Sequence, residues 1–187
     1  NGQHLSNTVE KIGESYYGFD YRGVMYANRD FSIWNFESQM SSDYRAKEDG
    51  RLYANEWYTN EREVFYYYGE DGQAYSGLHE IDGIQYCFSE YCRRYQDQSV
   101  TIDGKSYYCK PDGSAIELQN NDWTKVDDHF MYVKDGQALI NCVEKIGDSY
   151  YGFNYIGVMY ANEDIILRDF EGQISSYYRA KEDGRLY

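Results

Sequence analysis

Short runs of aromatic and apolar residues alternate along the chain with polar segments that contain glycine. A typical unit has an apolar residue, an Ile-x-Gly turn, a pair of aromatic residues, a second turn that closes on glycine, and a small apolar tail. Aromatic runs such as Phe65–Tyr68 favour β-strands. The Asp-Gly pairs between the runs favour tight turns, because glycine accepts positive φ and aspartate caps the turn locally. The pattern therefore predicts short β-hairpins, and we find no sustained helical period.

The same unit recurs along the whole chain. The clearest aromatic pairs are Tyr16-Tyr17, Tyr66-Tyr67, Tyr107-Tyr108 and Tyr150-Tyr151. The closing glycines are Gly23, Gly50, Gly72, Gly113, Gly136, Gly157 and Gly184, and Cys92 takes the glycine's place in the fourth unit. The steps between these positions are 27, 22, 20, 21, 23, 21 and 27 residues, which leaves room in each unit for one hairpin and a connector. Because an isolated hairpin is marginal in water, we expect consecutive hairpins to stack on their aromatic faces.

A longer repeat encloses the short one. VEKIGESYYGFDYRGVMYAN at residues 9–28 recurs as VEKIGDSYYGFNYIGVMYAN at residues 143–162, an offset of 134. Segments 9–53 and 143–187 share 33 identities over 45 aligned positions. We therefore predict an all-β fold, a β-solenoid of stacked short hairpins forming a single repeat array over residues 1–187. The predicted units are 9–28, 29–55, 56–77, 78–98, 99–120, 121–141, 142–162 and 163–187. The last unit is incomplete, so we expect the chain to be a slice of a longer array.

Composition alone would predict a disordered chain instead of a folded array. Leu, Ile, Val and Phe make up about 19% of the residues and the net charge is −14, a combination typical of disordered chains. The 24 tyrosines change this picture, since tyrosine buries a large ring while its hydroxyl stays hydrated or finds a partner. We therefore expect an open fold whose core is made of stacked rings rather than aliphatic side chains. The first tyrosine of each aromatic pair is expected to be the more buried of the two.

The negative charge and the hydropathy pattern exclude several functions. Nucleic-acid binding depends on neutralising phosphates with Lys and Arg, so a net charge of −14 argues against it. The same charge argues against docking on anionic membranes. No apolar run approaches the roughly 18 residues needed to span a bilayer, so no membrane insertion is expected. Residues 1–5 are polar and do not form a signal peptide, which leaves a removed leader or a start inside a longer protein as alternatives.

Neither catalysis nor metal binding has a supporting motif. The histidines are His4, His79 and His129, none lies in an HExxH motif, and no GxSxG motif is present. The acidic turns lack the spaced oxygen ligands of a calcium loop, so we expect no metal and no cofactor. Cys87 and Cys92 flank a predicted hairpin turn, which makes a local disulfide an alternative to free thiols. We therefore expect a protein that is not an enzyme.

Two segments carry a resemblance to known repeat families. TIDGKSYYCKPDGSA at residues 101–115 and EIDGIQYCFSEY at residues 80–91 resemble the cell-wall-binding, choline-binding-type repeats and the related glucan-binding repeats. They also resemble the C-terminal repetitive domain of large clostridial toxins, which is the closer match because it mixes short units with occasional longer ones. The longer toxin units carry a Glu-Gly-Gln stretch, and residues 170–174 read Phe-Glu-Gly-Gln-Ile. The choline-type pattern opens each unit with tryptophan, which only Trp57 and Trp123 do here.

The resemblance implies a fold and a kind of site. The families share stacked hairpins in a β-solenoid, and in the toxin repeats a glycan would sit where a long unit meets the next short one. Polar side chains of the long unit would bond sugar hydroxyls while an aromatic ring of the next unit stacks on the sugar. The corresponding ligand-binding candidates are Glu37, Gln39, Tyr44, Arg45, Lys47, Trp57, Tyr58 and Trp123. The structural alternative is a solvated loop beside core rings.

Two classes of function follow for the array. The first is a secreted or cell-surface bacterial module that binds carbohydrate, either a cell-wall polysaccharide or a host glycan, within a longer multidomain chain. Several weak sites along such an array would give avidity. The second is a structural spacer without a ligand. A third interpretation, an anchor that binds choline or teichoic acid, follows from the choline-type resemblance.

Overall fold

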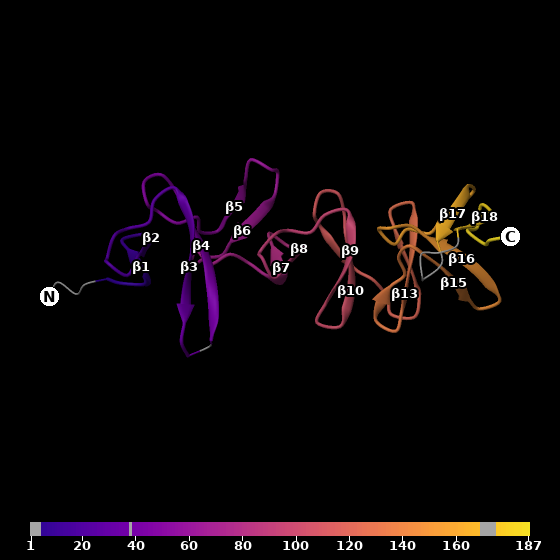
Figure 1. Ribbon diagram of the computed structural model, residues 1–187, viewed down its shortest axis with the longest axis horizontal. Coiled ribbons are helices and arrows are strands. Elements are labelled where there is room, and N and C mark those ends of the chain that lie inside the picture. The colour runs from indigo at the N-terminus through magenta and orange to yellow at the C-terminus, as the bar shows by residue number, and fades with distance from the viewer. Residues whose placement is uncertain (1–4, 38, 169–174) are drawn as a thin grey trace. The chain divides into compact units, whose positions relative to one another are not determined.

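The structure, a computed structural model, describes residues 5–37, 39–168 and 175–187 of the chain. All the regular secondary structure in this part is β, arranged as short antiparallel hairpins, which confirms the predicted all-β class (Figure 1). No helix long and apolar enough to cross a membrane occurs among these residues. The chain divides into two compact units, one of residues 1–79 and 88–94 and the other of residues 80–87 and 95–187.

The first unit is a series of two-stranded hairpins. They are β1 (Thr8–Ile12) with β2 (Ser15–Phe19), β3 (Arg29–Asn35) with β4 (Met40–Ala46), and β5 (Glu56–Thr59) with β6 (Phe65–Tyr68). The chain passes between the two units within β7 (Gly77–Ile81) and β8 (Ile84–Phe88). Strand β6 coincides with the aromatic run Phe65–Tyr68, so this strand prediction is confirmed.

The second unit adds a third strand to two of its hairpins. Its first sheet has the order β11-β10-β9, from β9 (Gln98–Ile102), β10 (Lys105–Cys109) and β11 (Ala115–Glu117). Its second has the order β12-β13-β14, from β12 (Trp123–Val126), β13 (His129–Lys134) and β14 (Gln137–Ala138). Two-stranded hairpins follow, namely β15 (Cys142–Ile146) with β16 (Ser149–Phe153) and β17 (Asp164–Arg168) with β18 (Ser175–Arg179).

Two kinds of turn alternate along the chain. The Asp103-Gly104 turn joins β9 to β10 with φ of 51° and 78°, the positive values that a two-residue type I′ hairpin turn requires. A wider turn follows the second strand of a hairpin and is capped by a side chain. There the side-chain oxygen of Asp20 or Asn154 accepts hydrogen bonds from the backbone N–H groups two and four residues later, and Asn60 makes the same bonds in the turn between β5 and β6. The polar turn segments thus define both ends of each repeat.

Backbone hydrogen bonds connect each of several hairpins to the hairpin before it. The residue two places after the closing glycine donates its N–H to a carbonyl on the second strand of the preceding hairpin. Leu52 donates to Tyr16 at 2.8 Å, and Ala74 donates to Asp43 at 2.8 Å. In the second unit the same bond runs from Met159 to Phe130 and from Leu186 to Tyr150, each at 2.8 Å. These contacts are made between nearest neighbours, as in repeat proteins.

The cores of the two units differ in chemistry. In the first unit, Tyr68, Ala74 and Cys92 are buried together and are covered by further tyrosine rings, as predicted. In the second unit, the buried cluster is mainly aliphatic and methionine, and consists of Tyr108, Leu118, Val126, Met131, Val133 and Val158. The expectation of a core without aliphatic side chains is therefore wrong for the second unit, where three-stranded sheets provide an additional packing surface.

The predicted order of burial within a pair of tyrosines does not hold for every hairpin. Tyr107 and Tyr108 are both buried, whereas Tyr150 is 53% exposed. Alternate residues of a strand point to opposite faces, so only one member of the pair in β16 faces the neighbouring hairpin. That member is Tyr151, whose ring lies 5.0 Å from the ring of Trp123. The prediction that the first ring is the more buried is thus wrong for this hairpin.

Candidate functional site

The long hairpin β3–β4 separates the predicted site residues into two groups. Glu37 and Gln39 lie in the turn between the two strands. Tyr44 and Arg45 lie near the opposite end of the hairpin, where Tyr44 pairs with Phe31 across the strands. Each strand has seven residues. At about 3.3 Å per residue the two groups are therefore too far apart to contact one small ligand.

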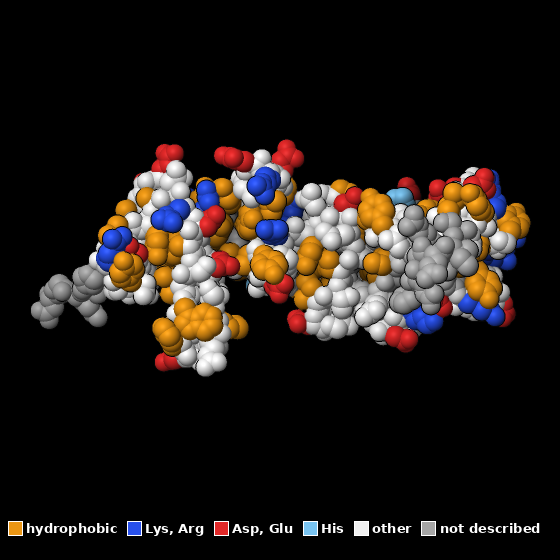
Figure 2. Space-filling view, in the orientation of Figure 1, with side chains coloured by type: hydrophobic (Ala, Val, Ile, Leu, Met, Phe, Trp, Pro, Cys, Tyr) orange, Lys and Arg blue, Asp and Glu red, His pale blue; other side chains and the backbone are white. Residues whose placement is uncertain are grey.

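The end of the hairpin that holds Glu37 and Gln39 is largely apolar. Trp34, Phe36 and Met40 are exposed there, and Figure 2 shows hydrophobic side chains gathered at the end of this hairpin. The Glu37 carboxylate makes no ion pair with a described residue, while the Glu37 backbone N–H donates to the side-chain oxygen of Asn35 at 2.9 Å. The structure therefore places Glu37 and Gln39 at this apolar end, away from the other candidates.

A groove of about 340 Å³ lies between hairpins β3–β4 and β5–β6 of the first unit. We call it the tyrosine groove. It combines aromatic rings with carboxylate, hydroxyl and amide groups, and it contains two of the predicted residues, Tyr44 and Tyr58. The residues that line it are Asp30, Phe31, Ser32, Asp43, Tyr44, Tyr58, Asn60, Tyr66, Tyr68, Ala74, Tyr91 and Cys92.

One wall of the tyrosine groove is a stack of three rings. Phe31 stacks on Tyr26 with ring centroids 4.0 Å apart and on Tyr44 with centroids 5.4 Å apart. The interplanar angles are 14° and 17°. The Phe31 ring also rests on the backbone of the first hairpin, because a Cβ added at Gly18 would overlap it. The wall is therefore held in place by β2 as well as by β3 and β4.

Charged groups form the edge of the tyrosine groove. The Arg45 guanidinium donates to Asp30 Oδ1 at 2.6 Å and lies 4.0 Å from the centroid of the Tyr58 ring. The Ser32 hydroxyl donates to Asp43 Oδ1 at 2.5 Å. A carboxylate has about four acceptor positions, so Asp30 and Asp43 are oriented by these bonds and still have capacity to accept others. Arg45 is not among the residues that line the groove, but it contacts Asp30 and Tyr58, which do.

Burial raises the pKa of tyrosine and cysteine side chains in the tyrosine groove. It raises the pKa of Tyr44 and of Tyr58 above their ordinary values, although the nearby Arg45 charge lowers the Tyr58 pKa in part. Burial also raises the pKa of the Cys92 thiol to about 11, with a further contribution from Asp43. The two tyrosine hydroxyls are therefore neutral at pH 7 and can both donate and accept hydrogen bonds.

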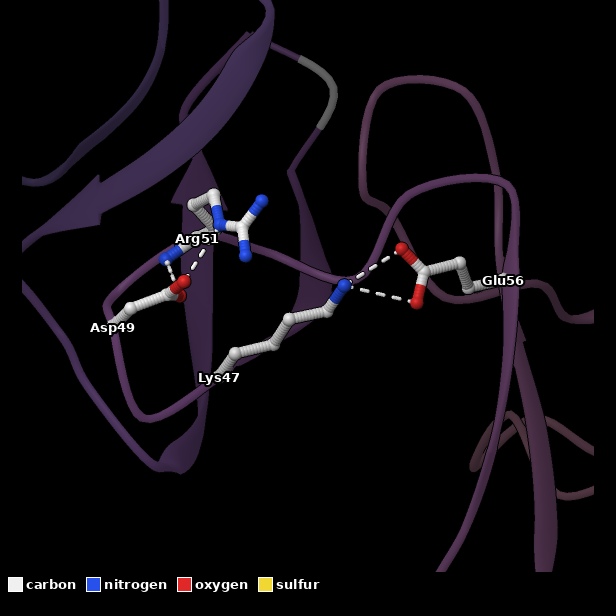
Figure 3. A network of polar contacts seen from close by, with 4 residues as sticks. All are labelled: Lys47, Asp49, Arg51 and Glu56. Carbon is white, nitrogen blue, oxygen red and sulfur yellow. Dashed lines mark hydrogen bonds and ion pairs between the residues drawn. The ribbon is translucent and has the colours of Figure 1, made fainter.

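Lys47 lies outside the tyrosine groove and is already paired. Its Nζ is 2.7 Å from Glu56 Oε1 and 4.8 Å from the centroid of the Tyr53 ring. Figure 3 shows the ammonium group reaching Glu56, while Asp49 and Arg51 pair with each other at 2.7 Å. Lys47 therefore links the long unit to the next hairpin, and it does not join Tyr44 and Tyr58 at the groove.

Trp57 packs into the stack of hairpins instead of facing the tyrosine groove. Its ring meets Tyr67 edge-on at 5.0 Å and stacks on Phe88 with centroids 6.1 Å apart. The Arg94 guanidinium lies 5.6 Å from the centroid of the Trp57 ring. The neighbouring residue Tyr58 points to the other face of the strand, which explains why only Tyr58 lines the groove.

Trp123 has matching ring contacts in the second unit and also lines a second pocket. It meets Tyr132 edge-on at 5.1 Å and stacks on Phe153 with centroids 6.0 Å apart. The second pocket, of about 860 Å³, is called the acidic pocket here. Its residues are Trp123, Asp128, His129, Phe130, Tyr151, Asn154, Val158, Met159, Tyr160, Ala161, Glu163, Glu182 and Asp183. No lysine or arginine occurs among these described lining residues, although Arg185 pairs with Asp183 at 2.6 Å.

Of the two alternatives for Cys87 and Cys92, the structure has the one without a local bridge, since none of the four cysteines is in a disulfide. The Cys92 thiol lies 3.8 Å from the carbonyl oxygen of Ala74 and 4.0 Å from Asp43 Oδ2. Among the residues that the structure describes, no cluster of three or more His, Cys, Asp or Glu side chains is arranged to hold a metal ion.

Of the twelve lining residues of the tyrosine groove, sequence reasoning found only Tyr44 and Tyr58 as ligand-binding candidates; those it missed include Asp30, Phe31 and Asp43. The signal that would have found them is the pairing of the long hairpin. Once Tyr44 is placed opposite Phe31, Asp30 falls opposite Arg45, and Asp43 falls opposite Ser32. Pairing the two strands outward from their turn would therefore have placed these residues beside Tyr44.

No protein-family model matches the sequence, and no curated protein is significantly similar to it. Solved structures are similar in fold. A structure of CbpF in complex with ipratropium has a TM-score of 0.53 at 12% identity, covering 96% of this chain and 58% of that chain. Choline binding protein F from Streptococcus pneumoniae, in the presence of a tetrasaccharide-pentapeptide peptidoglycan analogue, has a TM-score of 0.51 at 13% identity, covering 96% and 57%.

These likenesses establish that the chain shares the fold of a choline-binding repeat protein, as predicted. The chain spans less than two thirds of the length of either structure. The identities of 12% and 13% extend the likeness to the fold and not to individual binding residues. The resemblance to clostridial toxin repeats stays a prediction.

Proposed function

We propose that the protein is a non-catalytic module that binds carbohydrate, a polysaccharide of the bacterial cell wall or a host glycan, in the tyrosine groove. The observation that carries this proposal is the groove itself, which aromatic rings and the carboxylates Asp30 and Asp43 line together. A sugar ring has an apolar face of C–H groups, which stacks on an aromatic ring, and a rim of hydroxyls, which donate to carboxylates. Both partners are present, in the mixture typical of ligand pockets.

The two long repeat units, residues 29–55 and 163–187, differ in a way that supports a groove at the first of these repeats. At the offset of 134, Phe31 and Asp43 correspond to Ile165 and Tyr177. The ion pair at the base of the hairpin is retained, since Arg179 lies 3.0 Å from Asp164. The second long unit therefore keeps the scaffold and lacks both the central ring and one carboxylate. This difference favours a specialised role for the first.

The proposed setting is a secreted or cell-surface bacterial protein in which the hairpins stack as a β-solenoid within a longer chain. The neighbour-to-neighbour hydrogen bonds from Leu52 and Ala74 support the stacking. Choline binding protein F, which shares the fold, was crystallised in the presence of a peptidoglycan analogue, and this supports a cell-wall polymer as partner. In this setting the module would hold a partner domain against a glycan surface.

The tyrosine groove can be tested with purified peptidoglycan sacculi and with a soluble tetrasaccharide prepared from them. We expect wild-type protein to co-sediment with sacculi and to bind the tetrasaccharide in calorimetry. Asp43→Asn and Tyr58→Leu should each weaken binding about tenfold or more, because a hydrogen bond to a charged group is worth about 1.5–3 kcal/mol and a lost ring removes the stacking surface. A host-glycan array should be probed with the same variants.

Tyr21→Leu is the matched control, because Tyr21 is exposed and lies outside the tyrosine groove. It should bind like wild type. Equal binding by wild type, Asp43→Asn and Tyr58→Leu would show that the groove is not the site. No binding of wild type to sacculi or to any glycan would reject the binding module and leave the structural spacer.

A second candidate function is favoured by the acidic pocket. Trp123, Phe130 and Tyr151 present rings beside the carboxylates of Asp128 and Glu163, without a lysine or arginine among the described lining residues. Aromatic faces attract cations, quaternary ammonium groups above all, and neighbouring carboxylates strengthen this attraction. The pocket therefore fits choline, free or carried by teichoic acid.

Choline and its uncharged analogue 3,3-dimethylbutan-1-ol provide the matched test, since the two differ mainly in the charge. We expect millimolar choline to raise the melting temperature by linkage, whereas the alcohol should leave it unchanged. Glu163→Gln should reduce the effect of choline. An equal shift with both ligands, or no shift with choline, would contradict a cation site.

A further inference from the structure

Two cysteines of the second unit are buried side by side. Cys87 lies on β8 and Cys109 ends β10, and the side chains of both have zero solvent exposure. Tyr86, next to Cys87, pairs with Ser114, which is next to Ala115, the strand partner of Cys109, so the two hairpins meet at the cysteines. They are 22 positions apart in the sequence, so the contact joins two consecutive hairpins. The other two cysteines, Cys92 and Cys142, are also free thiols.

The position of Cys109 shows why the contact is possible. Cys109 stands four residues before Gly113, and the corresponding residues of two other hairpins are Phe88 and Phe153, both deeply buried. A thiol is much smaller than a phenyl ring. Its presence at this position leaves room for a second sulfur, which Cys87 supplies from the neighbouring strand.

The ionisation of the four thiols favours the same pair. The hydrogen bond with Cys109 lowers the pKa of Cys87, against the opposing effect of burial. Burial raises the pKa of Cys92 and of Cys142 to about 11. The thiolate is the nucleophile in disulfide exchange, and Cys109 is the sulfur that packs beside Cys87. Because both thiols have zero exposure once folded, glutathione disulfide must react with one of them before packing is complete.

We propose that Cys87 and Cys109 are a redox site, which forms a disulfide between consecutive hairpins when the protein folds in an oxidising compartment. The oxidant is a disulfide such as oxidised glutathione. The Cys87 thiolate attacks one sulfur of glutathione disulfide and releases one glutathione thiolate. Cys109, as its thiolate, then attacks Cys87 Sγ in the mixed disulfide and releases the second. The two protein thiols lose two electrons and two protons in total, and glutathione disulfide becomes two glutathione molecules.

Peptide mapping decides between this bond and the Cys87–Cys92 alternative without any substitution. Trypsin has no cleavage site between residues 87 and 92, so a Cys87–Cys92 bond stays within the peptide 63–93. A Cys87–Cys109 bond instead links peptide 63–93 to peptide 106–125, since Lys110 precedes proline and resists cleavage. We expect wild-type protein refolded with glutathione disulfide to give the linked pair, and reduction to separate it.

The double variant Cys92→Ala/Cys142→Ala retains only the proposed pair and removes ambiguity about which thiol of peptide 63–93 is bonded. After refolding with glutathione disulfide, its mass should fall by two hydrogens, and alkylation after unfolding in denaturant should label neither cysteine. The bond should raise the melting temperature by roughly 5–10 °C relative to the reduced form, as expected for a loop of this length in a domain of this size. Adding Cys109→Ala should abolish both changes.

Three results would overturn the proposal. The first is a wild-type peptide map in which the bond lies inside peptide 63–93. The second is a double variant that refolds completely and whose two thiols are both alkylated after unfolding in denaturant. The third is a bonded form that melts no higher than the reduced form, which would show that the bond distorts the packing. If the double variant does not fold, the wild-type map still decides between the two pairings.

Discussion

Replacing Phe153 with alanine is expected to lower the free energy of unfolding by about 3–5 kcal/mol, the usual cost of removing a fully buried phenyl ring. The Phe153 side chain has zero solvent exposure and its ring stacks on Trp123 at 6.0 Å. The loss combines the transfer free energy of the ring with the cost of the cavity that its removal leaves. Chemical denaturation followed by circular dichroism measures it. Because Trp123 also lines the acidic pocket, the choline-induced rise in melting temperature should shrink as well.

Tyr155→Ala is the matched control for Phe153→Ala, because it removes an aromatic ring two residues away that is 68% exposed. It should change stability by no more than about 0.5 kcal/mol. A loss below about 1 kcal/mol for Phe153→Ala would mean that the buried rings of the second unit are not a principal source of its stability.

Raising the pH above about 10 is expected to unfold the protein. Burial raises the pKa of several tyrosines in the folded state above this ordinary value, most strongly that of Tyr68. The others are Tyr44, Tyr58, Tyr107, Tyr108 and Tyr160. In this pH range the unfolded chain releases protons that the folded chain retains, so the free energy of unfolding falls as the pH rises. The contribution of these tyrosines to stability is fully present below about pH 10. It is lost as the pH rises toward their raised pKa values in the folded state.

Tyrosinate absorbance and circular dichroism, recorded together during an alkaline titration, measure this effect. Ionisation of the buried tyrosines should coincide with the loss of β-structure. Tyr68→Phe should move the midpoint to higher pH because it removes a hydroxyl that must stay neutral, while Tyr21→Phe, at an exposed position, should leave it unchanged. Full ionisation with an intact fold would contradict the burial of these tyrosines.

The strands and turns could be predicted because they depend on local sequence. The run Phe65–Tyr68 forms β6, and Asp103-Gly104 forms the hairpin turn that its φ preferences require. These features need only a few adjacent residues, and the repeat shows them many times. The hairpins are therefore predictable without knowledge of any contact between them.

The tyrosine groove could be predicted only in part, because it depends on contacts between hairpins. The position of the long unit points to Tyr44 and Tyr58, and the structure places both in the groove. The same position points to Trp57, but its ring packs against Phe88, a residue 31 positions later. Such distant partners leave no local signal. The prediction misplaces Glu37 because its distance from Tyr44 follows from strand length and register.

The hydrogen bonds from Leu52 to Tyr16 and from Ala74 to Asp43 have a mechanical consequence. Each hairpin is attached mainly to its neighbours, so a pulling force along the chain would detach hairpins one after another instead of breaking all contacts at once. Each unit of about 20 residues would lengthen the chain by up to roughly 70 Å when extended. A protein tethered to a surface through such hairpins would give way under shear in small steps, and each hairpin could fold again when the force falls.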